Sequence, residues 1–118
     1  MPSASNEIVI NRPVSEVFEF LSNPENDPMW RRGGRRISAD IEITDSQKDM
    51  LIEFQSTSGP IRPKGAYVFR DDGSNTRLQF LLEAELKGVK LLMAPFVQKA
   101  LNAEVSSLSK LKRVLEMF

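Results

Sequence analysis

The stretch INRPVSEVFEFLSNPENDPMW, residues 10–30, joins the apolar end of a strand to a helix and sets the start of the fold. Pro13 suits the first position of a helix, because its fixed backbone angle is helical and its missing N–H is not needed there. The apolar residues that follow recur at the spacing i, i+3, i+4, i+7: Val14, Val17, Phe18 and Leu21. The stretch therefore predicts a strand over residues 5–10 and a helix with one buried face after Pro13.

A second short helix is predicted directly after the first. Ser22 and Glu25 have the spacing of a capping box, in which the side chain of each residue accepts a hydrogen bond from the backbone N–H of the other. Pro28 restricts the residue before it to extended conformations, so this helix should end by Trp30.

From Gly34 onward the apolar residues alternate with polar ones, which is typical of strands with one buried face. We predict strands over residues 37–44, 51–56, 65–69 and 77–86, separated by turns at residues 45–49, 58–60 and 71–74. Together with residues 5–10 they give an antiparallel sheet of about five strands.

The rest of the chain predicts one long helix, from Leu91 or Pro95 almost to Phe118. Its apolar stripe consists of Val97, Leu101, Val105, Leu108, Leu111 and Leu115. When one face of a sheet is exposed to solvent, its apolar face must pack against another element, and this helix is the element able to cover it. We therefore predict an α+β fold, a single domain over residues 1–118 in which a curved sheet wraps a C-terminal helix.

The composition limits the chemistry that the protein can perform. The chain has 118 residues, 41% of them hydrophobic and 27% charged, which is typical of a soluble globular domain. Neither cysteine nor histidine is present, which excludes disulfides, thiol nucleophiles, Cys/His zinc sites and histidine-based catalysis. The acidic pairs Asp71–Asp72 and Asp45–Asp49 read as turn residues without ligand spacing, so we expect neither a metal nor a cofactor.

Charge and hydropathy also bear on partners and location. Lysine plus arginine and aspartate plus glutamate balance at 16 each, so we expect no nucleic-acid partner. The first ten residues lack the basic region and apolar run of a signal peptide. The sequence also contains no run of about 18 apolar residues that could insert stably in a membrane. We expect a cytoplasmic protein.

Three motifs in this order resemble the START/Bet v 1-like (SRPBCC) superfamily, specifically its bacterial polyketide cyclase/dehydrase-like branch. The first is residues 10–30, with a proline-initiated helix and a tryptophan after a Pro-Glu-Asn turn. The second is STSGPIRPKGAYVF, residues 56–69, followed by the hairpin DDGSNTRL, residues 71–78. The third is the C-terminal helix. The resemblance implies a helix-grip fold.

The chain departs from the family after Trp30. Similar members continue from this tryptophan into two further strands, whereas here about four residues separate it from the next strand. The chain thus resembles a member that lacks one β-hairpin, which would leave residues 37–44 as an exposed sheet edge. A long apolar edge tends to pair with another chain, so we predict a homodimer through Gly34–Asp45. The alternative is that the natural protein carries an internal segment that this sequence lacks.

The resemblance also implies a cavity for a hydrophobic small molecule, lipid-like or polyketide-like, between the sheet and the C-terminal helix. The candidate lining residues are Trp30, Ile41, Phe54, Tyr67, Phe80, Leu82, Met93, Phe96, Leu101 and Val105. The alternative is that these residues simply fill the core. In the segment MWRRGGRRIS, Arg32 and Arg35 are candidates for binding an anionic head group, and the alternative is a solvated turn.

Three functions remain open at this point. The first is binding or carrying a hydrophobic small molecule. The second is a cyclase/dehydrase-type enzyme, for which Tyr67 is the candidate acid or base, because the alternation turns Glu53 and Glu83 away from the apolar face. The third is a self-associating protein without a ligand.

Overall fold

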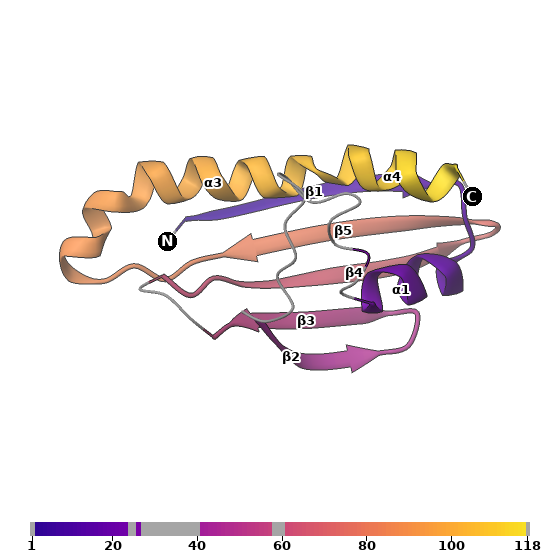
Figure 1. The fold of residues 1–118 in the computed structure, drawn as a ribbon, viewed down its shortest axis with the longest axis horizontal. Helices are drawn as coiled ribbons and strands as arrows, with labels where there is room; N and C mark the ends of the chain where they lie inside the picture. Colours follow the sequence, from indigo (N-terminus) through magenta and orange to yellow (C-terminus); the bar gives the residue numbers. More distant parts are fainter. Residues whose placement is uncertain (1, 24–25, 27–40, 58–60, 118) are drawn as a thin grey trace.

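The computed structural model describes residues 2–23, 26, 41–57 and 61–117. The elements in chain order are β1 (Ser3–Ile10), α1 (Val14–Ser22), β2 (Ile41–Gln47), β3 (Leu51–Ser56), β4 (Lys64–Asp72), β5 (Asn75–Glu83), η3 (Gly88–Met93), α3 (Ala94–Ser106) and α4 (Leu108–Glu116). The described strands form an antiparallel sheet in the order β1-β5-β4-β3-β2. Helices α3 and α4 run along the β1 side of the sheet, and α1 lies against β4 and β5 at the end of the sheet where α4 ends (Figure 1). The predicted α+β helix-grip fold is confirmed.

One face of the sheet carries the core, as the alternation of apolar residues predicts. Tyr67 pairs with Phe80 on one side and with Ile52 on the other, and all three side chains are buried. The first helix adds to this face through Phe18, whose ring meets Phe69 edge-on at a centroid distance of 5.3 Å. The same face therefore receives α1 near one end and the C-terminal helices along one side.

The C-terminal helices bury the predicted stripe. Each of its six members is at most 8% exposed: Val97, Leu101, Val105, Leu108, Leu111 and Leu115. The predicted long C-terminal helix is confirmed as a bent helix, in which α3 ends at Ser106 and α4 begins at Leu108. The hydroxyls of Ser106 and Ser107 both donate to the carbonyl of Ala103, at 2.7 and 3.5 Å, and such back-bonding bends helices.

Polar contacts fix the end of α4 to the junction between β1 and α1. Lys112 Nζ donates to the Val9 carbonyl at 2.8 Å, and Arg12 Nε donates to the Leu115 carbonyl at 3.0 Å. The backbone N–H of Asn11 donates to Glu116 Oε2 at 2.9 Å. The Lys112 ammonium and then this N–H lower the pKa of the Glu116 carboxyl, because both favour its charged form.

The strand β2 lies at one end of the described strand order, as predicted for an edge. It runs to Gln47, beyond the predicted end at Thr44, and a bulge shifts its register between Ile43 and Asp45. Ile43 is 52% exposed, so the prediction that the apolar residues of this strand form a buried face fails there. Ile43 pairs before the bulge and keeps the face that alternation gives it, so its exposure reflects the end position of β2 in the described strand order. The predicted homodimer through this edge stays a prediction.

Two other expectations concern residues outside the described ones. The short helix predicted after Ser22 falls there except for Asn23 and Asn26, and the absence of a hairpin after Trp30 falls there entirely. Within the described ranges, no helix is long and apolar enough to cross a membrane.

We predict that Leu108→Ala lowers the free energy of unfolding by about 2–5 kcal/mol, because this fully buried side chain leaves a cavity between helix and sheet. Urea denaturation followed by circular dichroism measures the change. The control Leu92→Ala removes the same atoms from a side chain that is 81% exposed and should change stability by less than about 0.5 kcal/mol. Equal effects of the two substitutions would contradict the burial of the stripe.

Candidate functional site

The structure divides the predicted lining residues into three groups. Six are buried members of one hydrophobic core: Phe54, Tyr67, Phe80, Leu82, Leu101 and Val105. Ile41 is partly buried against this core, whereas Met93 and Phe96 are exposed. Trp30, Arg32 and Arg35 lie outside the described residues. The ligand-binding role of these residues stays a prediction. Their burial differs, since some belong to the core and others are exposed to solvent.

Three aromatic rings occupy the inner face of the sheet. The ring centroid of Tyr67 lies 4.7 Å from that of Phe80 in a stacked arrangement and 5.5 Å from that of Phe54. Tyr67 is 3% exposed. The carboxylates of Glu53 and Glu83 are exposed, as the alternation predicted, and belong to the other face of the sheet. Tyr67 is thus enclosed by aromatic side chains, which is a core environment.

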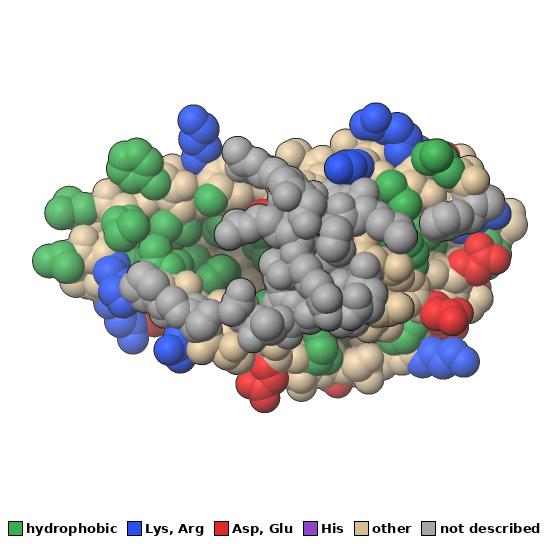
Figure 2. Space-filling model, in the orientation of Figure 1, with side chains coloured by type: hydrophobic (Ala, Val, Ile, Leu, Met, Phe, Trp, Pro, Cys, Tyr) green, Lys and Arg blue, Asp and Glu red, His purple; other side chains and the backbone are tan. Residues whose placement is uncertain are grey.

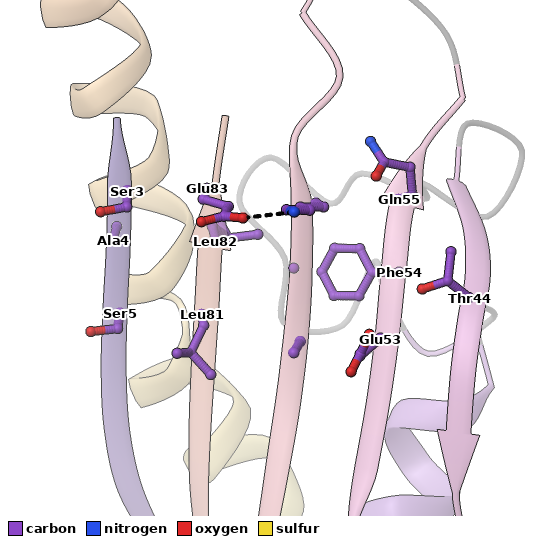
Figure 3. Close-up of a pocket in the computed structure, with 13 residues that line it drawn as sticks. Ser3, Ala4, Ser5, Thr44, Glu53, Phe54, Gln55, Leu81, Leu82 and Glu83 are labelled. Atoms are coloured by element: carbon purple, nitrogen blue, oxygen red, sulfur yellow. Dashed lines mark ion pairs between the residues drawn. The ribbon is translucent and has the colours of Figure 1, made fainter. Parts of the chain in front are cut away.

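A cleft of about 590 Å³ opens near the end of the sheet that includes Ser3 (Figure 3). It is lined by Ser3, Ala4, Ser5, Thr44, Glu53, Phe54, Gln55, Lys64, Gly65, Ala66, Leu81, Leu82 and Glu83. Strand pairing aligns Ser5, Leu81, Ala66 and Glu53 in one row across the sheet. Since side chains alternate along strands, this row faces away from Leu82 and the helices. Most of the cleft therefore belongs to the face of the sheet opposite α3 and α4.

The cleft is polar where it meets solvent. Lys64 Nζ lies 3.0 Å from Glu83 Oε1 in an exposed ion pair. The hydrogen bond and charge of Glu83 raise the pKa of Lys64, so this lysine stays protonated. An exposed pair of this kind contributes little to stability, and the exposed carboxylate of Glu53 is a third charge in the cleft lining.

Because Gly65 has no side chain, the side chains of Phe54 and Leu82 can pack directly against the backbone of β4 at the apolar side of the cleft. A Cβ atom at this position would lie 2.6 Å from Phe54 Cζ and 2.7 Å from Leu82 Cδ2. It would also lie 2.8 Å from the carbonyl oxygen of Leu81, which is part of a paired strand and cannot easily move. The absence of a side chain is therefore required here by close approach.

A second feature lies where the chain turns from β5 into α3. Every residue of η3 is exposed. Five large apolar side chains in and just after η3 form what we call the apolar rim: Val89 (83% exposed), Leu91 (55%), Leu92 (81%), Met93 (44%) and Phe96 (74%). Figure 2 shows hydrophobic side chains gathered at this end of the molecule. Exposed apolar side chains that cluster in this way mark interaction sites, whereas scattered ones do not.

Buried core residues flank the rim on both sides in the sequence. Leu86 precedes it in the chain and is 1% exposed, and Val97 follows it and is 8% exposed. The sequence predicted Met93 and Phe96 as lining residues of an internal cavity, and Val89, Leu91 and Leu92 were not among the predicted site residues. The missed signal is the run of four large apolar residues among five at 89–93, which no single helix face can bury.

The described part of the chain holds no group of three or more potential metal ligands. No protein-family model matches the chain, and no curated protein matches its sequence significantly. The comparison with solved structures is informative, because it finds the same fold at low sequence identity.

Three similar structures each align with 98% of this chain. The first is the di-domain ARO/CYC BexL from the BE-7585A biosynthetic pathway (TM-score 0.71, 13% identity), of which the chain spans about half, 47%. The second is MLL2253 from Mesorhizobium loti (TM-score 0.70, 15% identity, 97% of that protein). The third is a START superfamily protein from Mycobacterium smegmatis (TM-score 0.66, 14% identity, 97% of that protein). The chain therefore has the START-like, polyketide cyclase-like fold predicted from its motifs.

We predict that Gly65→Ala destabilises the protein by about 1–3 kcal/mol, because the added methyl group overpacks a site closed by backbone and side chains. Urea denaturation measures the loss. The neighbouring control Ala66→Ser places its new hydroxyl on the other face of β4 and should change stability by less than about 0.5 kcal/mol. A Gly65→Ala variant as stable as the parent protein would show that β4 does not carry this close contact.

Proposed function

We propose that the protein binds a hydrophobic small molecule, lipid-like or polyketide-like, at the apolar rim. The observation that carries the proposal is the exposure of five large apolar side chains beside the buried core of a helix-grip fold. Contact with an apolar ligand removes this surface from water, at about 25 cal/mol per Å².

The position of the rim supports the same proposal. In Figure 1 it lies at one end of the sheet, where α3 begins, while the end of α4 lies at the other. Two members of the lining set predicted from the sequence, Met93 and Phe96, belong to the rim. Two others, Leu82 and Leu101, are buried members of the adjoining core. A ligand could thus pack against the rim while the core side chains stay in place.

A cyclase-type reaction is less well supported by the described residues. Its candidate group, Tyr67, is 3% exposed and stacks on Phe80, so a substrate could reach its hydroxyl only if the aromatic rings moved. BexL is an ARO/CYC protein, and a related activity of this chain is supported only by the likeness of the two folds.

A fluorescent fatty acid, dansyl-aminoundecanoic acid, tests the proposal by titration into the purified protein. We expect saturable binding in the micromolar range, and we expect Phe96→Ala to weaken it about tenfold, because the lost ring contact corresponds to about 1.4 kcal/mol. Phe96 is 74% exposed, so its removal should leave the unfolding transition unchanged.

The matched control is Met117→Ala, which trims a side chain that is 81% exposed at the far end of α4. It should bind the probe as the parent protein does. Absence of saturable binding, or equal affinity of the Phe96→Ala variant, would overturn the proposed function.

A further inference from the structure

The apolar rim is bordered by positive charge. Between residues 86 and 103 the sequence holds three lysines, Lys87, Lys90 and Lys99, and neither an aspartate nor a glutamate. All three lysines are exposed. Lys87 forms an ion pair with Glu85 at 3.1 Å, just outside this segment. In a chain with a formal net charge of zero, the segment is thus a local basic region that coincides with the most exposed apolar surface.

The shape of the molecule places this region at a tip. The principal extents are 47, 23 and 22 Å, so the molecule is about twice as long as it is wide. In Figure 1, η3 and the start of α3 lie at one end of the long axis, and the end of α4 lies at the other. Figure 2 shows blue basic side chains flanking the green apolar ones at that end. A flat surface could therefore meet the rim and its lysines together.

The hydrogen bonds that attach α3 to the sheet begin after most of the rim, so the rim points away from the sheet. Gln98 ties α3 to β1, because its side-chain nitrogen donates to the Ser3 carbonyl at 2.6 Å and its oxygen accepts from the Ser3 N–H at 3.1 Å. Val89 and Leu92 precede this attachment and are more than 80% exposed. The backbone turns into η3 at Gly88, whose φ of +62° favours glycine. The turn projects the rim beyond the part of α3 that is held on the sheet.

From these features we infer that the rim docks on the surface of an anionic lipid bilayer. Apolar side chains would enter the boundary between head groups and acyl chains, while the lysines would meet the anionic head groups. An apolar protein partner would explain the rim but not the absence of acidic residues over residues 86–103. The inference shares the rim with the proposed function, yet vesicle binding requires no bound small molecule.

Flotation of the full chain with lipid vesicles tests the inference. We expect the chain to float with vesicles of phosphatidylcholine mixed with phosphatidylglycerol, and much less with vesicles of phosphatidylcholine alone. The double variant Val89→Asp/Leu92→Asp should bind the anionic vesicles at least about tenfold more weakly, because it replaces the two most exposed apolar side chains of the rim by charges that the head groups repel. Lys90→Gln/Lys99→Gln should weaken binding about twenty-fivefold, at roughly fivefold per lysine.

The control Met117→Asp adds a charge at the opposite tip and should float as the parent protein does. The inference fails if the parent chain does not float with anionic vesicles, or if the rim variants float equally well. It also fails if Val89→Asp/Leu92→Asp abolishes a dimer seen by sedimentation while the parent chain ignores vesicles, since the rim is then a subunit interface. Vesicle binding without fatty-acid binding would overturn the proposed function and leave this inference standing.

Discussion

The structure depends on the burial of one apolar stripe of α3 and α4 against β1 and β5. The six side chains of the stripe belong to the same core as Leu78, Phe80 and Leu82 of β5, and this packing supplies much of that core. Without the helices, the inner face of the sheet would expose these side chains and its aromatic rings to water, at a cost that a domain of marginal stability could not offset. The two helices therefore act as the second layer of the fold.

The helical layer is held unequally along its length. At the end of α4, Lys112, Arg12 and Glu116 bond it to the start of the chain, so that end is fixed by polar contacts as well as by burial. Toward the other end, Gln98 attaches α3 to β1, and the segment before it exposes Val89 and its neighbours. This asymmetry leaves an apolar surface at one tip, from which both the ligand and the bilayer proposals follow.

Much of the fold could be predicted from the sequence, because strand and helix periods differ and the stripe of α3 and α4 keeps its period throughout. The bend at Ser107 could not be predicted, because it follows from hydrogen bonds that the hydroxyls of Ser106 and Ser107 donate to the Ala103 carbonyl. The exposure of Ile43 could not be predicted either, because alternation assigns a residue to a face but does not show whether another element covers that face on an end strand. The site was predicted only in part: apolar residues at regular spacing indicate burial, so the exposure of Met93 and Phe96 came from the structure.

Both proposals assign the binding of hydrophobic molecules or lipids to the apolar rim. Nuclear magnetic resonance of the ¹⁵N-labelled chain, titrated first with a fatty acid and then with anionic lipid nanodiscs, tests this assignment most directly. We expect the largest amide changes on residues 88–97, with small changes over β2 and β3. Changes concentrated around Glu53, Lys64 and Glu83, on the face opposite α3 and α4, would contradict this assignment.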